Sequence, residues 1–201
     1  MKGLLIDGAK QMEIVLDDAQ ATTLINYLEL IIKWNKTYNL SAIRTMEEGV
    51  KKHLLDSLSI VPFIADTPLL DVGSGAGLPG IVIAIMKPDV SVSVLDTVGK
   101  KCHFMQFAKS QLGLKNLSVV NQRVEEFQSE QCFGQITSRA FSEVENTLKL
   151  TQHLLCDNGS YLLMKGANVE QESLPKEAEI HRLSVPKVSG VRFLVKIRKT
   201  I

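Results

Sequence analysis

The sequence has few cysteines, and they lie far apart. Cys102, Cys132 and Cys156 are the only three, and no Cys-x-x-Cys pair occurs. An odd, scattered set is not typical of a disulfide framework or of a zinc site. We therefore expect reduced thiols, a cytoplasmic protein and no bound metal.

Long hydrophobic runs are also missing. The longest, residues 81–86, is far too short to span a bilayer, and the run at residues 4–6 ends at Asp7, too early for a secretion signal. We expect no membrane segment.

An excess of charge of either sign is absent as well. The chain has 23 Lys and Arg against 22 Asp and Glu, a formal net charge of +1. The overall balance argues neither for nor against a polyanionic partner, so local charge must decide. A length of 201 residues with 45% hydrophobic residues permits one domain with a substantial core, which we take to be a monomer.

Helical patterns dominate the first 66 residues. Asp17 and Asp18 suit an N-cap and first turn, and apolar residues recur at helical spacing over 24–32. A second helix is predicted over 46–60. The sequence thus predicts an N-terminal helical subdomain over 1–66, packed as one unit with residues 67–201.

From Pro68 onward, predicted strands alternate with helices. The predicted strands are 69–72, 91–95, 117–121, 135–138, 160–164, 180–185 and 191–197; the predicted helices lie before Pro88 and over 100–112, 142–155 and 169–179. Such alternation predicts an α/β fold with a mostly parallel sheet and helices on both faces. The last two strands predict a closing antiparallel hairpin.

A glycine-rich loop follows the first predicted strand. Gly73, Gly75, Gly77 and Gly80 fall within eight residues, between a strand and a helix. A cofactor lying across strand ends needs backbone without Cβ atoms, and a helix N-terminus offers free N–H groups to an anion. The alternative is a plain left-handed turn between strand and helix.

The loop fits two classes of cofactor. Residues 75–80 match the dinucleotide pattern G-x-G-x-x-G, so an NAD-dependent oxidoreductase remains an alternative function. Asp71 extends the loop to Asp-x-Gly-x-Gly-x-Gly, a form typical of methyltransferases, and no room remains for a hydride-acceptor domain. A non-catalytic nucleotide- or RNA-binding protein is a further alternative.

Acidic and apolar residues follow the next two strands. Asp96 ends the second strand, where a carboxylate can accept from ribose hydroxyls or cap the following helix. Arg123, Val124 and Glu125 follow the third strand, where an adenine edge usually meets the backbone. Alone, that tripeptide would be an ordinary solvated loop.

The chain strongly resembles the glucose-inhibited division protein B family, the ribosomal RNA small subunit methyltransferases G. The resemblance covers about residues 24–166 and rests on segments 34–40, 53–58, 71–80, 138–140 and 164–166. It implies a class I methyltransferase fold and methylation of N7 of a guanine in the 530 loop of 16S rRNA. The implied S-adenosylmethionine contacts are Gly73, Leu78, Val124, Glu125 and Arg139, with Asp96 at the ribose; Gly75 joins them through the loop.

Methylation of guanine N7 needs no proton transfer by the protein. N7 has a lone pair and no proton, so we expect no catalytic general base and assign no catalytic residue. Catalysis is then mostly positioning. For RNA, the candidates at strand ends are Lys100, Arg123, Lys165 and also Arg139. Five cations and no acid over 187–201 are either a second RNA contact or a protected edge strand.

Two aromatic features have structural and functional interpretations. His53 either packs against Trp34 or contacts RNA, and we favour packing. Trp34 and Tyr38 are likewise favoured as core over a base-stacking platform.

Overall fold

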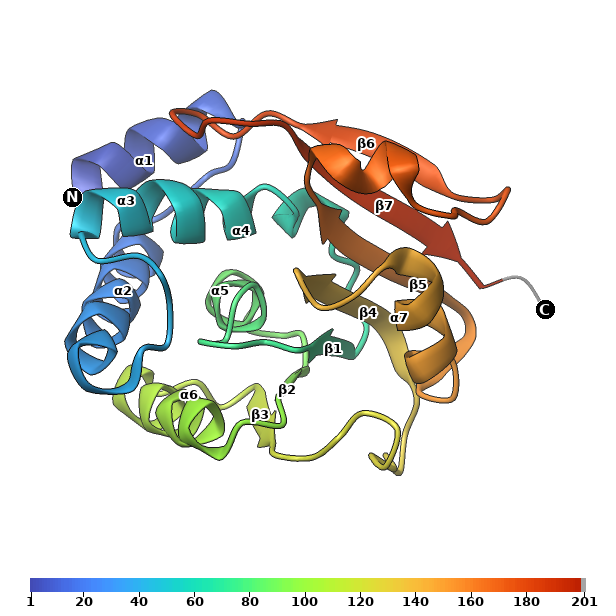
Figure 1. Cartoon of the computed structure of the whole chain (residues 1–201). Coiled ribbons are helices and arrows are strands. Elements are labelled where there is room, and N and C mark those ends of the chain that lie inside the picture. Colours follow the sequence, from blue (N-terminus) through green and yellow to red (C-terminus); the bar gives the residue numbers. More distant parts are fainter. Residues whose placement is uncertain (200–201) are drawn as a thin grey trace.

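Seven strands form one sheet in the computed structural model, which describes residues 1–199 (Figure 1). The last two residues of the predicted 67–201 unit and of the basic tail lie outside the described residues. The strand order is β3-β2-β1-β4-β5-β7-β6. The strands are β1 (Leu69–Val72), β2 (Val92–Leu95), β3 (Leu117–Val120), β4 (Phe133–Arg139), β5 (Leu155–Lys165), β6 (Glu179–Leu183) and β7 (Arg192–Arg198).

Helices precede the sheet and connect its parallel strands. The N-terminal helices are α1 (Lys2–Gln11), α2 (Asp18–Tyr38), α3 (Met46–Gly49), η1 (Val50–Leu55), α4 (Asp56–Leu58) and η2 (Val61–Phe63). The later ones are α5 (Gly80–Met86), α6 (Gly99–Leu112), α7 (Val144–Thr151) and η3 (Ala167–Gln171). No helix within residues 1–199 is long and apolar enough to cross a membrane.

The sheet has the predicted mostly parallel topology. Strands β1 to β5 pair in parallel, and β7 pairs antiparallel with both β5 and β6. All four residues of β1 are buried, as expected for a central parallel strand covered on both faces. The predicted α/β fold with a closing antiparallel hairpin is therefore confirmed.

Helix α2 ties the N-terminal helices to the sheet. Asp17 and Gln20 form a capping box at its start, as its sequence predicts. Farther along, the buried Tyr27 hydroxyl donates to the carbonyl of Ala76 across 2.6 Å. One hydrophobic cluster includes buried residues of α2, α5 and α6. The division into 1–66 and 67–201 stays a prediction, although no strand precedes Leu69.

The predicted helix over 46–60 is formed, with a change of winding. Helices α3, η1 and α4 run on without a break (Figure 1). Within this run, η1 is a π-helical segment. A π segment turns the following side chains relative to a regular helix and often accompanies a functional site. It carries Lys52 and His53 and leads directly to Asp56.

Two predicted helices differ from the structure. The prediction over 169–179 is wrong, because only the short 3-10 turn η3 forms. Pro175 lacks an N–H and disfavours helical backbone at Leu174, which explains the failure. The helix predicted over 142–155 is shorter: α7 covers Val144–Thr151, a turn follows it, and Leu155 already belongs to β5.

The prediction of three reduced thiols is also wrong. Cys132 and Cys156 form a disulfide, with their Cα atoms 5.0 Å apart. They are 24 residues apart in sequence, but the parallel pairing of β4 and β5 sets Phe133 opposite Leu155 and so brings the two cysteines together. Cys102 is free and buried.

Candidate functional site

Loops from four parallel strands meet at one edge of the sheet. Because parallel strands all end at the same edge, Gly73 after β1, Asp96 after β2, Arg139 at the end of β4 and Lys165 at the end of β5 are brought together there. Strand β7 runs the opposite way, so its first residue, Arg192, lies at this edge too. Two adjoining pockets open along it.

The first, which we call the glycine-loop pocket, has a volume of about 440 Å³. Five residues predicted from the sequence line it: Gly73, Asp96, Arg123, Val124 and Glu125. Ala140, Phe141 and Ser142 form another wall. Val124 is buried while Arg123 and Glu125 are exposed, so the pocket has an apolar floor and a charged rim.

The glycines are required by the backbone of the loop. Gly73, Gly75 and Gly77 have φ values of +67°, +61° and +90°. A Cβ atom on Gly73 would lie 2.6 Å from Phe141, on the wall of the pocket. Only glycine combines this left-handed backbone with this approach. The alternative of a plain turn accounts for the φ values but not for the contact at Gly73.

Asp96 joins the glycine loop to the start of α6. Its Oδ2 accepts from the N–H of Gly75, and its Oδ1 accepts from the N–H of Val98, each across 2.9 Å. Lys101 Nζ lies 3.8 Å from Oδ2. Asp96 therefore lines the pocket and fixes the loops on either side of it. The N-cap residue of α6 is Val98, which makes no side-chain cap bond, so the alternative role of Asp96 as a helix cap is not observed.

Asp71 lies buried beneath the loop. Its Oδ2 accepts from the N–H of Gly80 across 2.9 Å, whereas Oδ1 has no partner within residues 1–199. Burial raises the pKa of Asp71 to about 7, more than the hydrogen bond from Gly80 lowers it. This carboxyl group therefore shapes the loop from below.

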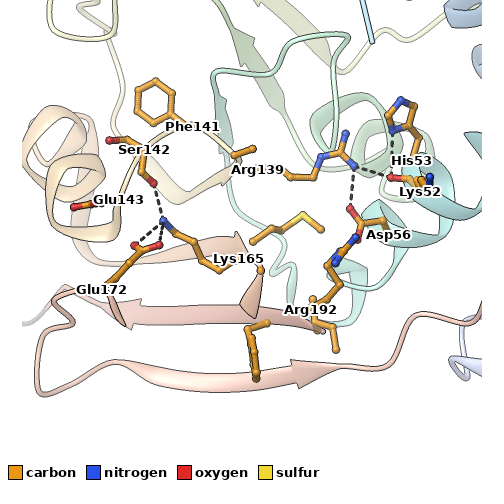
Figure 2. A pocket seen from close by; sticks show the side chains of 15 residues that line it. Lys52, His53, Asp56, Arg139, Phe141, Ser142, Glu143, Lys165, Glu172 and Arg192 are labelled. Atoms are coloured by element: carbon orange, nitrogen blue, oxygen red, sulfur yellow. Dashed lines mark hydrogen bonds and ion pairs between the residues drawn. The ribbon is translucent and has the colours of Figure 1, made fainter. Parts of the chain in front are cut away.

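The second pocket, which we call the arginine pocket, has a volume of about 530 Å³ and shares Ala140, Phe141 and Ser142 with the first. Arg139 lines this pocket and not the glycine-loop pocket, so its predicted contact with a cofactor stays a prediction. Figure 2 shows Arg139, Lys165 and Arg192 around it.

Asp56 and Arg192 were not predicted as site residues. Asp56, with a side chain only 5% exposed, accepts from Arg139 Nη1 and from Arg192 Nε, each across 3.0 Å. A charged residue between Leu55 and Leu58, at a buried position of a helix, was the available signal for Asp56. For Arg192, the signal was its place at the start of an antiparallel strand.

Lys165 is held by the protein itself. Its Nζ donates to the carbonyl of Ser142 across 2.6 Å and to both carboxylate oxygens of Glu172, at 3.0 and 2.8 Å (Figure 2). Glu172 also accepts from the N–H of Val144 at the start of α7. A phosphate contact by Lys165 stays a prediction, and it would require sharing Lys165 with Glu172.

His53 does not pack against Trp34, contrary to the favoured interpretation. Its Nε2 lies 2.6 Å from Ser41 Oγ. Burial, together with the nearby Arg139 charge, lowers the pKa of His53 to about 4, so the ring is neutral near pH 7. Trp34 instead contacts the rings of Tyr38, His103, Phe104 and Phe107.

Three predicted residues line neither pocket. Gly75 holds Asp96 through its N–H, and Leu78 is buried in the core below the loop. Lys100 is exposed near the start of α6. Their predicted contacts with cofactor or RNA stay predictions.

Known structures share this fold. A SAM-dependent methyltransferase from Aquifex aeolicus superposes with a TM-score of 0.56 at 16% identity, covering 72% of this chain and 90% of that one. An rRNA methylase from Streptococcus thermophilus gives a TM-score of 0.53 at 12% identity, covering 73% and 95%. These similarities identify the fold of class I methyltransferases.

Sequence relatives are much closer. A ribosomal RNA small subunit methyltransferase G from Ruthia magnifica subsp. Calyptogena magnifica is 66% identical, over 98% of this chain and 97% of the relative. Its namesake from Stutzerimonas stutzeri is 47% identical, over 98% and 94%. The family model GidB, rRNA small subunit methyltransferase G, matches residues 20–201. The chain therefore belongs to the family of rRNA small subunit methyltransferase G.

Proposed function

We propose that this chain transfers a methyl group from S-adenosylmethionine to N7 of a guanine in the 530 loop of 16S rRNA. The observation that carries the proposal is the wall of Ala140, Phe141 and Ser142 shared by two pockets. One pocket is lined by the glycine loop and the other by arginines. Family membership over nearly the whole chain supports both the reaction and the rRNA substrate.

The glycine-loop pocket fits S-adenosylmethionine. Gly73 lines the pocket without a Cβ atom, which would collide with Phe141 on the pocket wall, and Asp96 presents a carboxylate to ribose hydroxyls. Val124 offers an apolar surface to adenine, with Glu125 at the rim. When bound, this cofactor supplies an electrophilic methyl group.

The arginine pocket suits the RNA side of the reaction. Arg139 and Arg192 place positive charge beside the shared wall, where phosphates flanking a splayed-out guanosine would lie. Phe141 lines both pockets and offers an apolar surface between them. The protein's task is to hold N7 in line with the methyl donor.

No residue is assigned as a general base, because N7 carries no proton to be removed. His53, which lines the arginine pocket, is hydrogen-bonded to Ser41. Its pKa of about 4 keeps the ring neutral near pH 7. The carboxyl group of Asp56 is occupied by two arginines. The site therefore suits a reaction in which the protein positions N7 and the methyl donor and removes no proton.

The direct test is methyl transfer in vitro. The protein is incubated with labelled S-adenosylmethionine and with either naked 16S rRNA or whole small subunits, and the labelled nucleoside is identified by mass spectrometry. N7-methylguanosine is expected as the product. Label in an exocyclic amine, a ribose hydroxyl or no nucleoside at all would reject the proposal.

The finer assignments belong to the same proposal. The chain acts as a monomer, and it works in the cytoplasm, where its rRNA substrate is made. That location rests on the substrate and not on the cysteines, since two of the three are paired. An NAD-dependent oxidoreductase would have to bind NADH in place of S-adenosylhomocysteine, which a titration of both ligands decides.

A further inference from the structure

A buried carboxylate holds two arginines from distant parts of the chain. Asp56 begins α4, Arg139 ends β4 and Arg192 begins β7. The two carboxylate oxygens of Asp56 are divided between the arginines, Oδ2 to Arg139 Nη1 and Oδ1 to Arg192 Nε (Figure 2). The arrangement brings two guanidinium groups to one side of the arginine pocket.

The charges at this point do not balance. One carboxylate faces two guanidinium groups, which leaves one positive charge. The other cations of the pocket have their own partners: Lys52 pairs with Glu48 at 2.9 Å, and Lys165 pairs with Glu172 at 2.8 Å. Glu143, which also lines the pocket, is the exposed N-cap residue of α7. An anion placed between the two arginines would complete the balance.

Both arginines keep donors for such an anion. Arg139 uses Nη1 for Asp56 and for the carbonyl of Lys52, while Arg192 uses Nε for Asp56 and Nη1 for the carbonyl of Val191. Within residues 1–199, the Nη2 groups of both have no acceptor. Their side chains are 21% and 30% exposed, so solvent and ligands reach them. Paired guanidinium donors match the oxygens of a phosphate.

We propose that Asp56, Arg139 and Arg192 form a phosphate site that holds an RNA phosphodiester next to the guanosine to be methylated. The arginines make the contact, and Asp56 is a positioning residue that fixes them. This inference rests on the proposed function. Holding the guanidinium groups in place beforehand lowers the entropy lost on binding.

Arg192 allows the sharpest test, since it is reached from solvent and, unlike Arg139, is not among the residues predicted to contact the cofactor. In Arg192→Met, the RNA concentration for half-maximal methylation should rise about tenfold, with kcat changed much less. The slope of log Kd for RNA against log salt should fall by about 0.7, the value for one phosphate on a single strand. Binding of S-adenosylhomocysteine should stay the same.

Arg198→Met is the matched control. It removes the same charge from the same strand, but Arg198 is exposed and lines neither pocket. Its RNA affinity and salt slope should stay close to those of the unaltered protein. Arg192→Lys, which keeps the charge but not the paired donors, should fall between the two. It also replaces Arg192→Met if that variant does not fold.

Asp56→Asn tests the positioning role. If Asp56 acts through the arginines, then Asp56→Asn combined with Arg192→Met should weaken RNA binding no more than the stronger single variant does. Additive losses would mean that Asp56 acts separately. Thermal melts of every variant check the fold.

Two results would overturn the site. If Arg192→Met lowers thermal stability but leaves RNA affinity and salt slope unchanged, the ion pairs only brace the hairpin. If it weakens S-adenosylhomocysteine instead of RNA, the anion is the cofactor carboxylate. RNA binding is measured directly and needs no methyl transfer, so the outcome is separate from failure of the proposed reaction.

Discussion

Gly75 donates its backbone N–H to Asp96 Oδ2 across 2.9 Å, and this bond joins the loop after β1 to the loop after β2. The carboxylate that faces the glycine-loop pocket thus also fixes the loop that forms it. Cofactor binding and loop order should therefore depend on the same residue.

Asp96→Ala should weaken binding of S-adenosylhomocysteine by about 1–3 kcal/mol, the range for hydrogen bonds to a charged group. Stability should fall as well, because the N–H groups of Gly75 and Val98 lose their acceptor. Calorimetry and urea unfolding measure the two effects. Thr45→Ala, which removes the cap of α3 outside both pockets, is the control for a lost cap alone. If Asp96→Ala loses stability as Thr45→Ala does and keeps its affinity for S-adenosylhomocysteine, Asp96 serves only to fix the two loops.

Gly73→Ala should weaken binding of the cofactor at least about tenfold. Its φ of +67° costs an L residue about 1 kcal/mol, and the new Cβ must displace Phe141 from the pocket wall. Gly113→Ala is the matched control, since Gly113 has the same φ but nothing within 4 Å of its Cβ position. Both variants should lose the stability that the left-handed backbone costs, Gly73→Ala more because Phe141 must also move, and only Gly73→Ala should lose affinity for S-adenosylhomocysteine. Equal affinity of the two variants for S-adenosylhomocysteine would contradict the role of the glycine loop in cofactor binding.

Asp71 should make stability depend on pH. Its folded pKa of about 7 lies above the unfolded value, so the folded state holds the proton more tightly, and stability falls as pH rises from about 4 to 7. Asp71→Asn removes this dependence. The difference in free energy of unfolding, variant minus unaltered protein, should therefore rise by about 3 kcal/mol from pH 5 to pH 8. Urea unfolding measures it, with exposed Asp89→Asn as control; a difference that is constant with pH would contradict the assignment.

Local sequence chemistry was enough to predict the glycine-loop pocket. Turn-forming glycines, an acid at a strand end and the parallel order of the strands placed Gly73, Asp96 and Val124 correctly at one edge. These features depend on residues close together in sequence, or on the rule that parallel strands end on one side. The family resemblance added the reaction.

The arginine pocket depended on features that local patterns do not reveal. Arg192 reaches the site because β7 runs antiparallel to β5, with Phe193 opposite Lys165. Asp56 reaches it from the residue that directly follows the π-helical segment. The pairing of Cys132 with Cys156 likewise follows from strand register, which sequence spacing does not give. The failed helix over 169–179 was different, since Pro175 was a visible warning.

The absence of a general base has a kinetic consequence. Single-turnover methylation with saturating RNA should show no rise in rate between about pH 6 and 8 attributable to a protein base. Asp71 titrates in this range, so Asp71→Asn serves as the background for the measurement. A steep rise that one Asp, Glu or His substitution abolishes, with fold and both affinities intact, would point to an exocyclic amine or a hydroxyl as the target.

The central claim is tested most directly in cells. The 530 loop of 16S rRNA is isolated from cells with and without this protein, and its nucleosides are mapped by mass spectrometry of nuclease fragments. The account predicts one N7-methylguanine that disappears with the protein and returns when the unaltered chain is supplied. An unchanged N7-methylguanine in cells lacking the protein would contradict it.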